Sequence, residues 1–240
     1  MKSIRPGPVD GVVAAPPSKS VVQRVAAIAA LNRGTVELRA RSFCEDALAA
    51  LRVTRALGTQ VHAEDGGVFM KGSRRPMDSR LMCGEAGTTL RIFSAVGAVF
   101  DHQLVVMASG TLNARPVDML EGPLTALGAT CVSSGGLPPL LVRGPIRGGH
   151  AVVDASETSQ HLSGLLIALP CCEGDSDLEI QDLRSAPYVR LTLQLLDRFG
   201  IRIEADEDLR HIHVPGGQAY PSLRLVAEGD WSGATFPLVA

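Results

Sequence analysis

The chain repeats itself about every 70 residues, and each repeat begins a predicted helix with a turn that carries hydroxyl side chains. The equivalent positions are Ser18, Thr88 and Thr158, and each precedes an apolar run of helical length. Free N–H groups and the positive end of the dipole make a helix N-terminus attractive to anions. Taken singly, such hydroxyls are usually helix caps. Three repeated helix starts, the first with Lys19 beside it, instead predict one pocket for a small molecule with several negative charges.

Each repeat also contains a second predicted helix that ends at a glycine. Apolar residues spaced for one helix face lead to Gly58, Gly128 and Gly200, and glycine is the residue that most readily forms a left-handed C-cap. Hairpin-like strands follow each glycine, and an extended run lies between the two helices of each repeat. The predicted elements are, in order, residues 21–31, 35–38, 47–57, 61–64, 68–71, 90–100, 103–107, 116–127, 131–133, 140–142, 161–169, 178–180, 189–199, 201–205 and 211–214.

These units predict an α/β (α+β) domain with a threefold internal repeat. Each unit reads helix–strand–helix–strand–strand, with a further strand leading into the next unit. We expect three copies to pack around a pseudo-threefold axis, with helices inside and sheets outside. A fourth copy begins with a predicted strand at 223–227, continues with a helix entry at 228–235 and stops at the end of the chain. We therefore expect a piece of a longer protein; a frayed C-terminal tail is the alternative.

Composition argues against several classes of protein. With 240 residues, 45% of them hydrophobic, and a net charge of -2, the chain can bury a core and is not expected to bind nucleic acid or a membrane surface. No apolar run reaches the roughly 20 residues of a membrane helix, and residues 1–20 lack the apolar segment of a signal peptide. Five cysteines without C-x-x-C spacing predict reduced thiols and a cytoplasmic location. His211 and His213 share a strand face without an evident third ligand, so we expect surface histidines and no metal.

Six motifs resemble those of one enzyme family. They are PPSKSVVQR from residue 16, EAGTTLR from 85, SGTLNARP from 109, DASETSQHLSGLL from 154, SAPYVRLTL from 185 and VAEGDWSGATFPL from 226. Their order and spacing are similar to those of the 3-phosphoshikimate 1-carboxyvinyltransferase (EPSP synthase) family of enolpyruvyltransferases. The resemblance implies two similar domains. It assigns residues 1–15 to a strand of the other, first domain, 16–226 to the three-repeat domain, and 227–240 to the crossover into a missing remainder.

The resemblance also implies an activity. Family members transfer the enolpyruvyl group of phosphoenolpyruvate to the 5-hydroxyl of shikimate 3-phosphate and release phosphate, without metal or organic cofactor, in aromatic amino-acid biosynthesis. Lys19 would be catalytic and would contact both substrates. By this resemblance shikimate 3-phosphate is bound by Lys19, Ser20, Arg24, Thr158, Ser159, Gln160, Ser185 and Tyr188, and phosphoenolpyruvate by Lys19, Gly87, Arg115 and Gln160. The remaining acid–base residues would lie in the other domain, so this chain alone is expected to be inactive. The resemblance also implies that the full-length enzyme is monomeric.

Two residues depart from the family pattern. Glu85 stands where many members have Asn, and a carboxylate there would repel phosphoenolpyruvate unless it turns away or pairs with Arg91. Ile92 stands where many members have Pro, and the change is expected to loosen that helix start. The affinity for phosphoenolpyruvate and for the inhibitor glyphosate therefore stays open.

Two other functions also stay open. One is the related enolpyruvyltransferase that acts on UDP-N-acetylglucosamine, which commonly has a reactive Cys in the loop before the second helix of its middle repeat. That loop is residues 111–115 here and contains no Cys, which argues against this function. The other is a non-catalytic domain that binds phosphorylated metabolites.

At the crossover we expect Trp231 to pack and Asp230 to cap a helix.

Overall fold

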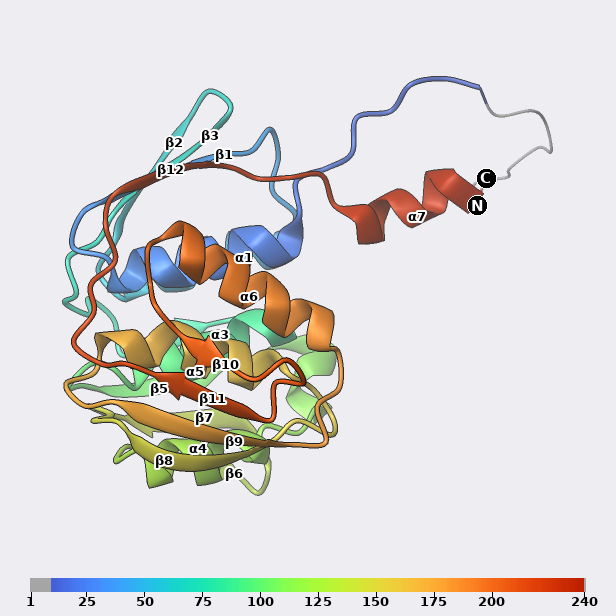
Figure 1. Ribbon diagram of the computed structural model, residues 1–240. Helices are drawn as coiled ribbons and strands as arrows, with labels where there is room; N and C mark the ends of the chain where they lie inside the picture. Colours follow the sequence, from blue (N-terminus) through green and yellow to red (C-terminus); the bar gives the residue numbers. More distant parts are fainter. Residues whose placement is uncertain (1–9, 240) are drawn as a thin grey trace.

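The computed structural model describes residues 10–239. Its strands form three four-stranded sheets, which lie around a set of interior helices (Figure 1). The first sheet contains β12 (Leu223–Val226), β1 (Thr35–Arg39), β3 (Gly67–Lys71) and β2 (Gln60–Glu64), in that spatial order. The second contains β4 (Arg80–Met82), β5 (Gln103–Met107), β7 (Leu137–Arg143) and β6 (Thr130–Ser134). The third contains β8 (Gly149–Asp154), β9 (Ser176–Gln181), β11 (His211–Val214) and β10 (Glu204–Ala205).

All three sheets have the same topology, which confirms the predicted repeat. In each, a parallel pair is followed by an antiparallel hairpin: β4 lies parallel to β5 and β8 parallel to β9, while β5 and β9 pair antiparallel with β7 and β11. Such alternation of strands and helices in a repeated unit buries one face of each sheet against shared helices. The predicted fold class is therefore confirmed.

The first helix of each unit lies in the interior. These helices are α1 (Lys19–Leu31), α3 (Gly87–Gly97) and α5 (Gln160–Ala168), and every residue from Val21 to Leu31 of α1 is buried. Because such a helix has almost no solvent face, its sequence is mostly apolar on all sides, and the exceptions in that stretch of α1, Gln23 and Arg24, are buried too. The second helices are α2 (Glu45–Ala56), α4 (Glu121–Ala126) and α6 (Ala186–Arg198), and they precede Gly58, Gly128 and Gly200, whose φ angles of +93°, +97° and +69° confirm the predicted left-handed C-terminal turns.

The strand that we assigned to a fourth copy belongs to the first sheet. β12 pairs parallel with β1, with Val36 opposite Leu223 and Leu38 opposite Leu225. It therefore takes the place that β4 and β8 take in the other two sheets, and the prediction of a separate fourth unit is wrong for this strand. The physical reason is that no strand between residues 10 and 34 covers the open edge of β1, and an unpaired edge in the body of a sheet leaves backbone groups unsatisfied.

Two predicted elements are shorter than expected. The helix predicted at 116–127 is a 3₁₀ turn, η2 (Asp118–Leu120), followed by α4, because Pro123 can be accommodated only in the first turn of a helix. The strand predicted at 201–205 is reduced to β10. The side chain of Gln218 accepts a hydrogen bond from the backbone N–H of Arg202 at 2.9 Å and donates one to its carbonyl at 3.0 Å, which replaces strand pairing there. The remaining 3₁₀ turns are η1 (Gly110–Ala114) and η3 (Leu169–Cys171).

Helices α3 and α5 pack at backbone contact. A Cβ placed on Gly164 would lie 2.9 Å from both the Cα and the carbonyl oxygen of Ile92. Ile92 itself is fully buried inside α3, and the expected loosening of this helix start stays a prediction. Close packing at this position fixes the distance between two of the helices whose N-termini were predicted to form a common pocket.

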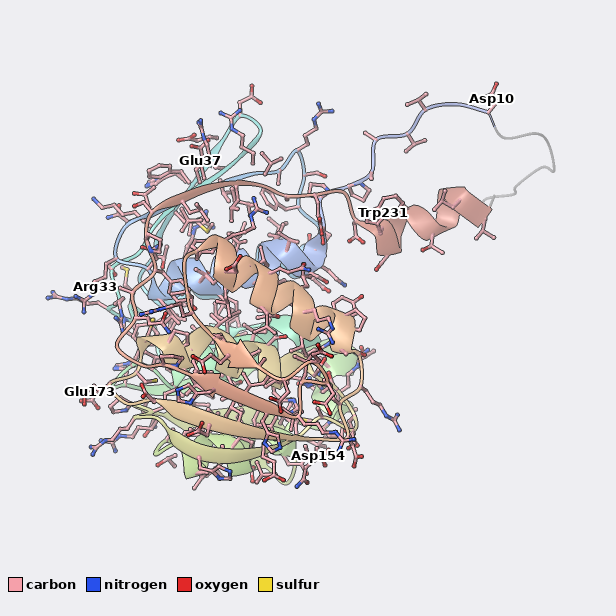
Figure 2. The ribbon with its side chains drawn as sticks, in the orientation of Figure 1. Asp10, Arg33, Glu37, Asp154, Glu173 and Trp231 are labelled. Carbon is pink, nitrogen blue, oxygen red and sulfur yellow. The ribbon has the colours of Figure 1, made fainter. Side chains whose placement is uncertain are left out.

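The two ends of the described chain leave the three-sheet body together. Residues 10–16 and the final helix α7 (Trp231–Val239) extend to the same side in Figure 1. Next to the body the two segments run antiparallel: Ser18 donates a backbone hydrogen bond to Glu228 at 2.8 Å, and Asp230 donates one to Pro16 at 2.7 Å. Trp231 is 77% exposed, so the expectation that it packs is wrong for this chain (Figure 2). Residues 1–9 of the predicted N-terminal strand lie outside the described residues.

We predict that Gly164→Ala lowers the free energy of unfolding by about 1–3 kcal/mol, because the added methyl group overpacks the contact between α3 and α5. Urea denaturation followed by circular dichroism measures this value. The matched control is Gly122→Ala in α4, where a new Cβ meets no atom within 4 Å. The control should be neutral or stabilising by up to about 1 kcal/mol, since alanine favours a helix more than glycine does. Equal effects of the two substitutions would contradict the prediction.

Candidate functional site

The three hydroxyl-bearing helix starts meet at one pocket, which confirms the central geometric prediction from the sequence. The pocket has a volume of about 210 Å³. Helix α1 contributes Lys19, Ser20 and Arg24, α3 contributes Thr88, and α6 and the turn before it contribute Tyr188 and Ser185; the start of α5 adds Thr158, Ser159 and Gln160. Eight of the ten residues expected at the substrate sites therefore line a single cavity, although they come from segments far apart in the chain.

The charge of Arg24 lies inside this arrangement without a carboxylate partner. Its side chain is 1% exposed, and within residues 10–239 no ion pair reaches it. The guanidinium donates to the hydroxyl of Thr192 at 2.7 Å and to that of Ser163 at 3.1 Å. It also donates to the carbonyls of Ser20 and Tyr188 at 3.0 and 3.2 Å. Burial lowers the pKa of Arg24 to about 10, so the guanidinium stays a cation at neutral pH. A buried cation with only neutral partners favours an anion in the adjoining pocket.

Lys19 contributes a second positive charge at the edge of the pocket. Its Nζ lies 3.0 Å from a carboxylate oxygen of Asp46 on α2. The hydrogen bond to Asp46 raises the pKa of Lys19 above 10.5, so the ammonium is protonated at neutral pH. The backbone N–H of Lys19 donates to the carboxylate of Asp230 at 3.3 Å, and the other oxygen of that carboxylate accepts from Gly233 at the start of α7. The expectation that Asp230 caps a helix is therefore confirmed.

The alternative role of the hydroxyls as helix caps is not what the structure shows at two of the three positions. Ser18 occupies the N-cap position of α1 but forms no capping hydrogen bond, and Thr88 lies inside α3, whose N-cap is Ala86. Only Thr158 accepts a hydrogen bond from a following backbone N–H, that of Gln160, at 3.3 Å. The first N–H groups of α1 and α5 are thus engaged by the side chains of Asp230 and Thr158, whereas no N-cap residue of α1, α3 or α5 caps its own helix. The other N–H groups of these first turns are suited to an external anion.

Gly87 and Arg115 do not line this pocket and instead lie next to it, beyond Gln160. A Cβ on Gly87 would stand 3.0 Å from Nη1 of Arg91 and 4.0 Å from Nη1 of Arg115. Arg91 links the two regions, since its Nη1 donates to Gln160 Oε1 at 3.0 Å and its Nη2 to the carbonyl of Pro116 at 2.9 Å. The absence of a side chain on Gly87 therefore keeps open a space flanked by two guanidinium groups, which is the geometry that a carboxylate or phosphate recognises.

Comparison with known proteins agrees with this geometry. The family described as "EPSP synthase (3-phosphoshikimate 1-carboxyvinyltransferase)" matches residues 4–240. The chain belongs to the EPSP synthase family. Two similar curated relatives are named 3-phosphoshikimate 1-carboxyvinyltransferase. The one from Methanothermobacter thermautotrophicus is 34% identical, and the match covers 96% of this chain and 55% of the relative. The one from Methanothrix thermoacetophila is 35% identical, and the match covers 99% of this chain and 57% of the relative. The solved EPSP synthase of Acinetobacter baumannii superposes with a TM-score of 0.80 at 26% identity, covering 95% of this chain and 52% of that one. The chain spans about half the length of the EPSP synthases it matches.

The carboxylate of Glu85 turns toward Thr111 and not toward Arg91. It accepts hydrogen bonds from the backbone N–H and the hydroxyl of Thr111, at 2.9 and 2.8 Å. These bonds, together with the positive charge of Arg115, lower the pKa of Glu85. The carboxylate is therefore ionised and bound to Thr111 of η1. Pairing with Arg91 does not occur among the described contacts. Of the two arrangements considered for Glu85, the structure shows the one in which the carboxylate turns away.

Sequence reasoning missed the residues that support the pocket. Asp46 and the pair Ser163 and Thr192 contact Lys19 and Arg24, yet none of them lies in a position that the motifs mark as binding. Arg91 was considered only as a partner of Glu85. One signal was available: Arg91 is a charged residue within an apolar helical run, which is typical of a buried side chain with a specific partner.

Ser185 has a backbone conformation that is costly for a residue with a side chain. It lies immediately before α6 with φ of 58° and ψ of 40°, in the left-handed region. Its carbonyl accepts a hydrogen bond from the hydroxyl of Ser159 at 3.5 Å. Non-glycine residues in this region persist where the surrounding structure holds them, and they cluster at binding sites.

The two histidines considered for a metal lie on the third sheet, away from the pocket. Nδ1 of His213 lies 2.7 Å from a carboxylate oxygen of Asp177 on the neighbouring strand β9, and this contact raises the pKa of His213. Across residues 10–239, no group of three or more His, Cys, Asp or Glu side chains is arranged to hold a metal ion. The helices of this described part are also too short or too polar to cross a membrane.

We predict that His161, which follows Gln160 in α5, makes the fold less stable in mild acid. Burial lowers the pKa of His161 to about 4, against 6.5 for an ordinary imidazole. Below pH 6.5 the unfolded chain takes up the proton before the folded chain does, so the free energy of unfolding decreases as the pH falls from 6.5 toward 4. The loss should amount to about 2 kcal/mol between pH 7 and pH 5.

Urea denaturation at both pH values, on the natural chain and on His161→Leu, isolates this contribution from that of the carboxylates. The variant should lose less stability over the same interval, because it has no imidazole to protonate. If the two proteins lose stability equally, the buried imidazole is not responsible.

Proposed function

We propose that this chain supplies the shikimate 3-phosphate half of the active site of an EPSP synthase. The single observation that supports this most strongly is the convergence of three helix N-termini on a pocket with a buried, carboxylate-free Arg24. Lys19, Ser20, Arg24, Thr158, Ser159, Gln160 and Ser185 would bind the phosphate and ring hydroxyls of shikimate 3-phosphate, with Tyr188 against the ring. Phosphates favour this combination of guanidinium, ammonium, hydroxyl and helix N–H groups.

The adjacent space between Arg91 and Arg115 would receive phosphoenolpyruvate. Gly87 borders it and Gln160 lies between it and the first pocket, so that Gln160 would contact both substrates. Lys19 would stand near both and act as the catalytic cation of this half-site. In the proposed reaction the 5-hydroxyl of shikimate 3-phosphate adds to C2 of phosphoenolpyruvate and C3 gains a proton, and loss of phosphate and a C3 proton then restores the enolpyruvyl double bond.

Proton transfer in this reaction needs groups that the pocket does not contain. A general acid must protonate the methylene carbon, and a base must accept the proton of the attacking hydroxyl. Among the described residues that line the pocket there is no carboxylate. We therefore place most of the acid–base groups in a second domain that closes over the pocket, with no cofactor assigned.

The domain organisation that we propose follows from the two segments that leave the body together. Residues 16–226 would be one domain, and residues 1–15 and 227–240 would be the two crossings to a second one. The exposed apolar residues of these segments support this proposal, since Val12 is 102%, Val13 77% and Leu238 72% exposed. Such side chains favour a covering partner, and a second domain of the same polypeptide is the one proposed. We propose a monomeric, cytoplasmic full-length enzyme.

We predict that the purified chain binds shikimate 3-phosphate in isothermal titration and does not bind UDP-N-acetylglucosamine. Lys19→Ala should weaken binding by about 1–3 kcal/mol, the range of charge-assisted hydrogen bonds. Arg24→Lys should cause a similar loss, because it keeps the charge but removes the guanidinium fork, and circular dichroism verifies that it folds. Lys71→Ala on β3 is the control and should bind normally. Preference for the nucleotide sugar would instead favour the related enolpyruvyltransferase.

We also predict that this chain alone has negligible turnover with both substrates. The pocket binds one substrate but lacks the acid and base that the chemistry requires, and removal of such groups typically costs a factor of about 10²–10⁴ for each. A phosphate-release assay with the purified chain measures this. Sustained release of phosphate that depends on both substrates would refute the division of the site between two domains, while binding without turnover favours it over a non-functional fold.

A further inference from the structure

The ammonium of Lys19 has an anionic partner that none of the sequence motifs contains. Asp46 lies in the first turn of α2, and its Oδ2 is 3.0 Å from Lys19 Nζ. A second carboxylate, that of Asp230, contacts a different atom of the same residue, the backbone nitrogen, at 3.3 Å. Asp46 is therefore the carboxylate that contacts the side chain of Lys19.

The position of Asp46 is fixed by a buried polar bridge between three helices. Gln23 of α1 donates to the hydroxyl of Thr89 of α3 at 2.9 Å, and that hydroxyl donates to the backbone carbonyl of Asp46 at 3.4 Å. Gln23 and Thr89 are both fully buried. The first turn of α2 is thereby held against α1 and α3, and a carboxylate in a first turn is also stabilised by the helix dipole.

We propose that Asp46 is a positioning residue that holds the ammonium of Lys19 at the edge of the pocket, ready for the phosphorylated substrate. This inference rests on the proposed function. An ammonium has three N–H donors, and the contact with Asp46 uses one of them, so two remain for a ligand. Without Asp46 the long side chain of Lys19 would be free to adopt many rotamers, and ordering it on binding would reduce the affinity.

The opposite effect, competition between Asp46 and the ligand for Lys19, is expected to be the smaller one. The side chains of Lys19 and Asp46 are 44% and 34% exposed, and ion pairs with this exposure contribute little net free energy. A phosphate with two negative charges therefore attracts the ammonium in spite of Asp46. We therefore expect positioning to dominate. The two effects can be told apart, because removal of Asp46 weakens ligand binding if positioning dominates and strengthens it if competition dominates.

Five titratable or charged groups surround Lys19. They are Asp46 and Cys44 at the start of α2, Asp230 on the crossing segment, Tyr188 on α6 and Arg24 one turn further along α1. The hydrogen bond to Asp46 is the largest influence that raises the pKa of Lys19, while partial burial lowers it. Removal of the Asp46 charge should therefore lower the pKa of the ammonium, an effect that a merely structural aspartate would not produce.

The first experiment is titration of shikimate 3-phosphate into three variants. Asp46→Ala should weaken binding about three- to tenfold, as expected from ordering one long side chain. Asp46→Asn keeps an oxygen acceptor and should weaken it less. Glu45→Gln is the matched control: it removes the same charge from the same turn, but Glu45 is 86% exposed and lies 4.0 Å from Arg52. Unchanged or tighter binding by Asp46→Ala would overturn the proposal.

The second experiment tests whether Asp46 acts through Lys19. In a Lys19→Met background, Asp46→Ala should change the affinity less than twofold, because the side chain to be positioned is gone. An undiminished loss in that background would show that Asp46 acts by another route and would overturn the proposal.

The third experiment measures the ammonium itself and needs no substrate. The chain contains only Lys2, Lys19 and Lys71, so labelling lysine with ¹³C at Cε gives a readily assigned titration by nuclear magnetic resonance. Asp46→Asn should move the titration of Lys19 to lower pH, with the Lys71 resonance as internal reference. An unmoved Lys19 titration would overturn the proposal. If shikimate 3-phosphate does not bind the natural chain, the proposed function fails, and this titration still decides whether Asp46 controls Lys19.

Discussion

The packing of α1, α3 and α5 against one another is the constraint on which the site depends. These helices are buried over most of their length, and α3 and α5 approach so closely at Gly164 that no Cβ fits between them. Rigid helices at fixed distances bring their N-termini to one place, and side chains on them are held more exactly than they would be on loops. The pocket is thus a direct consequence of how the interior is filled.

That packing also explains why two arginines can be buried without carboxylates. Arg24 and Arg91 are 1% and 7% exposed, and hydroxyls, carbonyls and an amide satisfy most of their donors. Neutral partners hold a guanidinium in place without cancelling its charge, so the charge stays available to a ligand. A carboxylate in the same place would give a stable ion pair but would repel a phosphate. In contrast, the charge of Lys19 at the pocket edge is balanced by Asp46, which is acceptable there because both side chains reach solvent.

The closure of the first sheet by β12 connects the fold to the proposed domain arrangement. Because the strand that covers β1 comes from residues near the end of the chain, the last segment returns to the start of α1. The carboxylate of Asp230 then meets the first backbone N–H of α1, next to the proposed catalytic cation. A change in the direction of the crossing segments would therefore alter the hydrogen bond between Asp230 and the backbone N–H of Lys19.

Many of the helices, strands and pocket residues could be predicted from the sequence, because the signals for them lie in short stretches of the chain. The interval between Ser18, Thr88 and Thr158, the C-terminal glycines and the apolar runs indicated the type and order of most elements, since each depends on residues close together in the chain. The bounds of β4 and β8, the strands that lead into the second and third units, were not predicted. The motifs identified eight residues that do line one pocket. Local signals failed where a distant residue intervened, as when Gln218 replaced strand pairing at Arg202.

The tertiary structure alone decided the partners of the site residues. The sequence could not show that Arg24 would be held by Thr192 and Ser163, residues more than 130 positions away, or that Glu85 would turn to Thr111. It also could not show that the strand before the crossover would complete the first sheet. Hydrogen-bond partners and sheet edges are settled by which surfaces come together in space, whereas periodicity and capping are properties of a short stretch of chain.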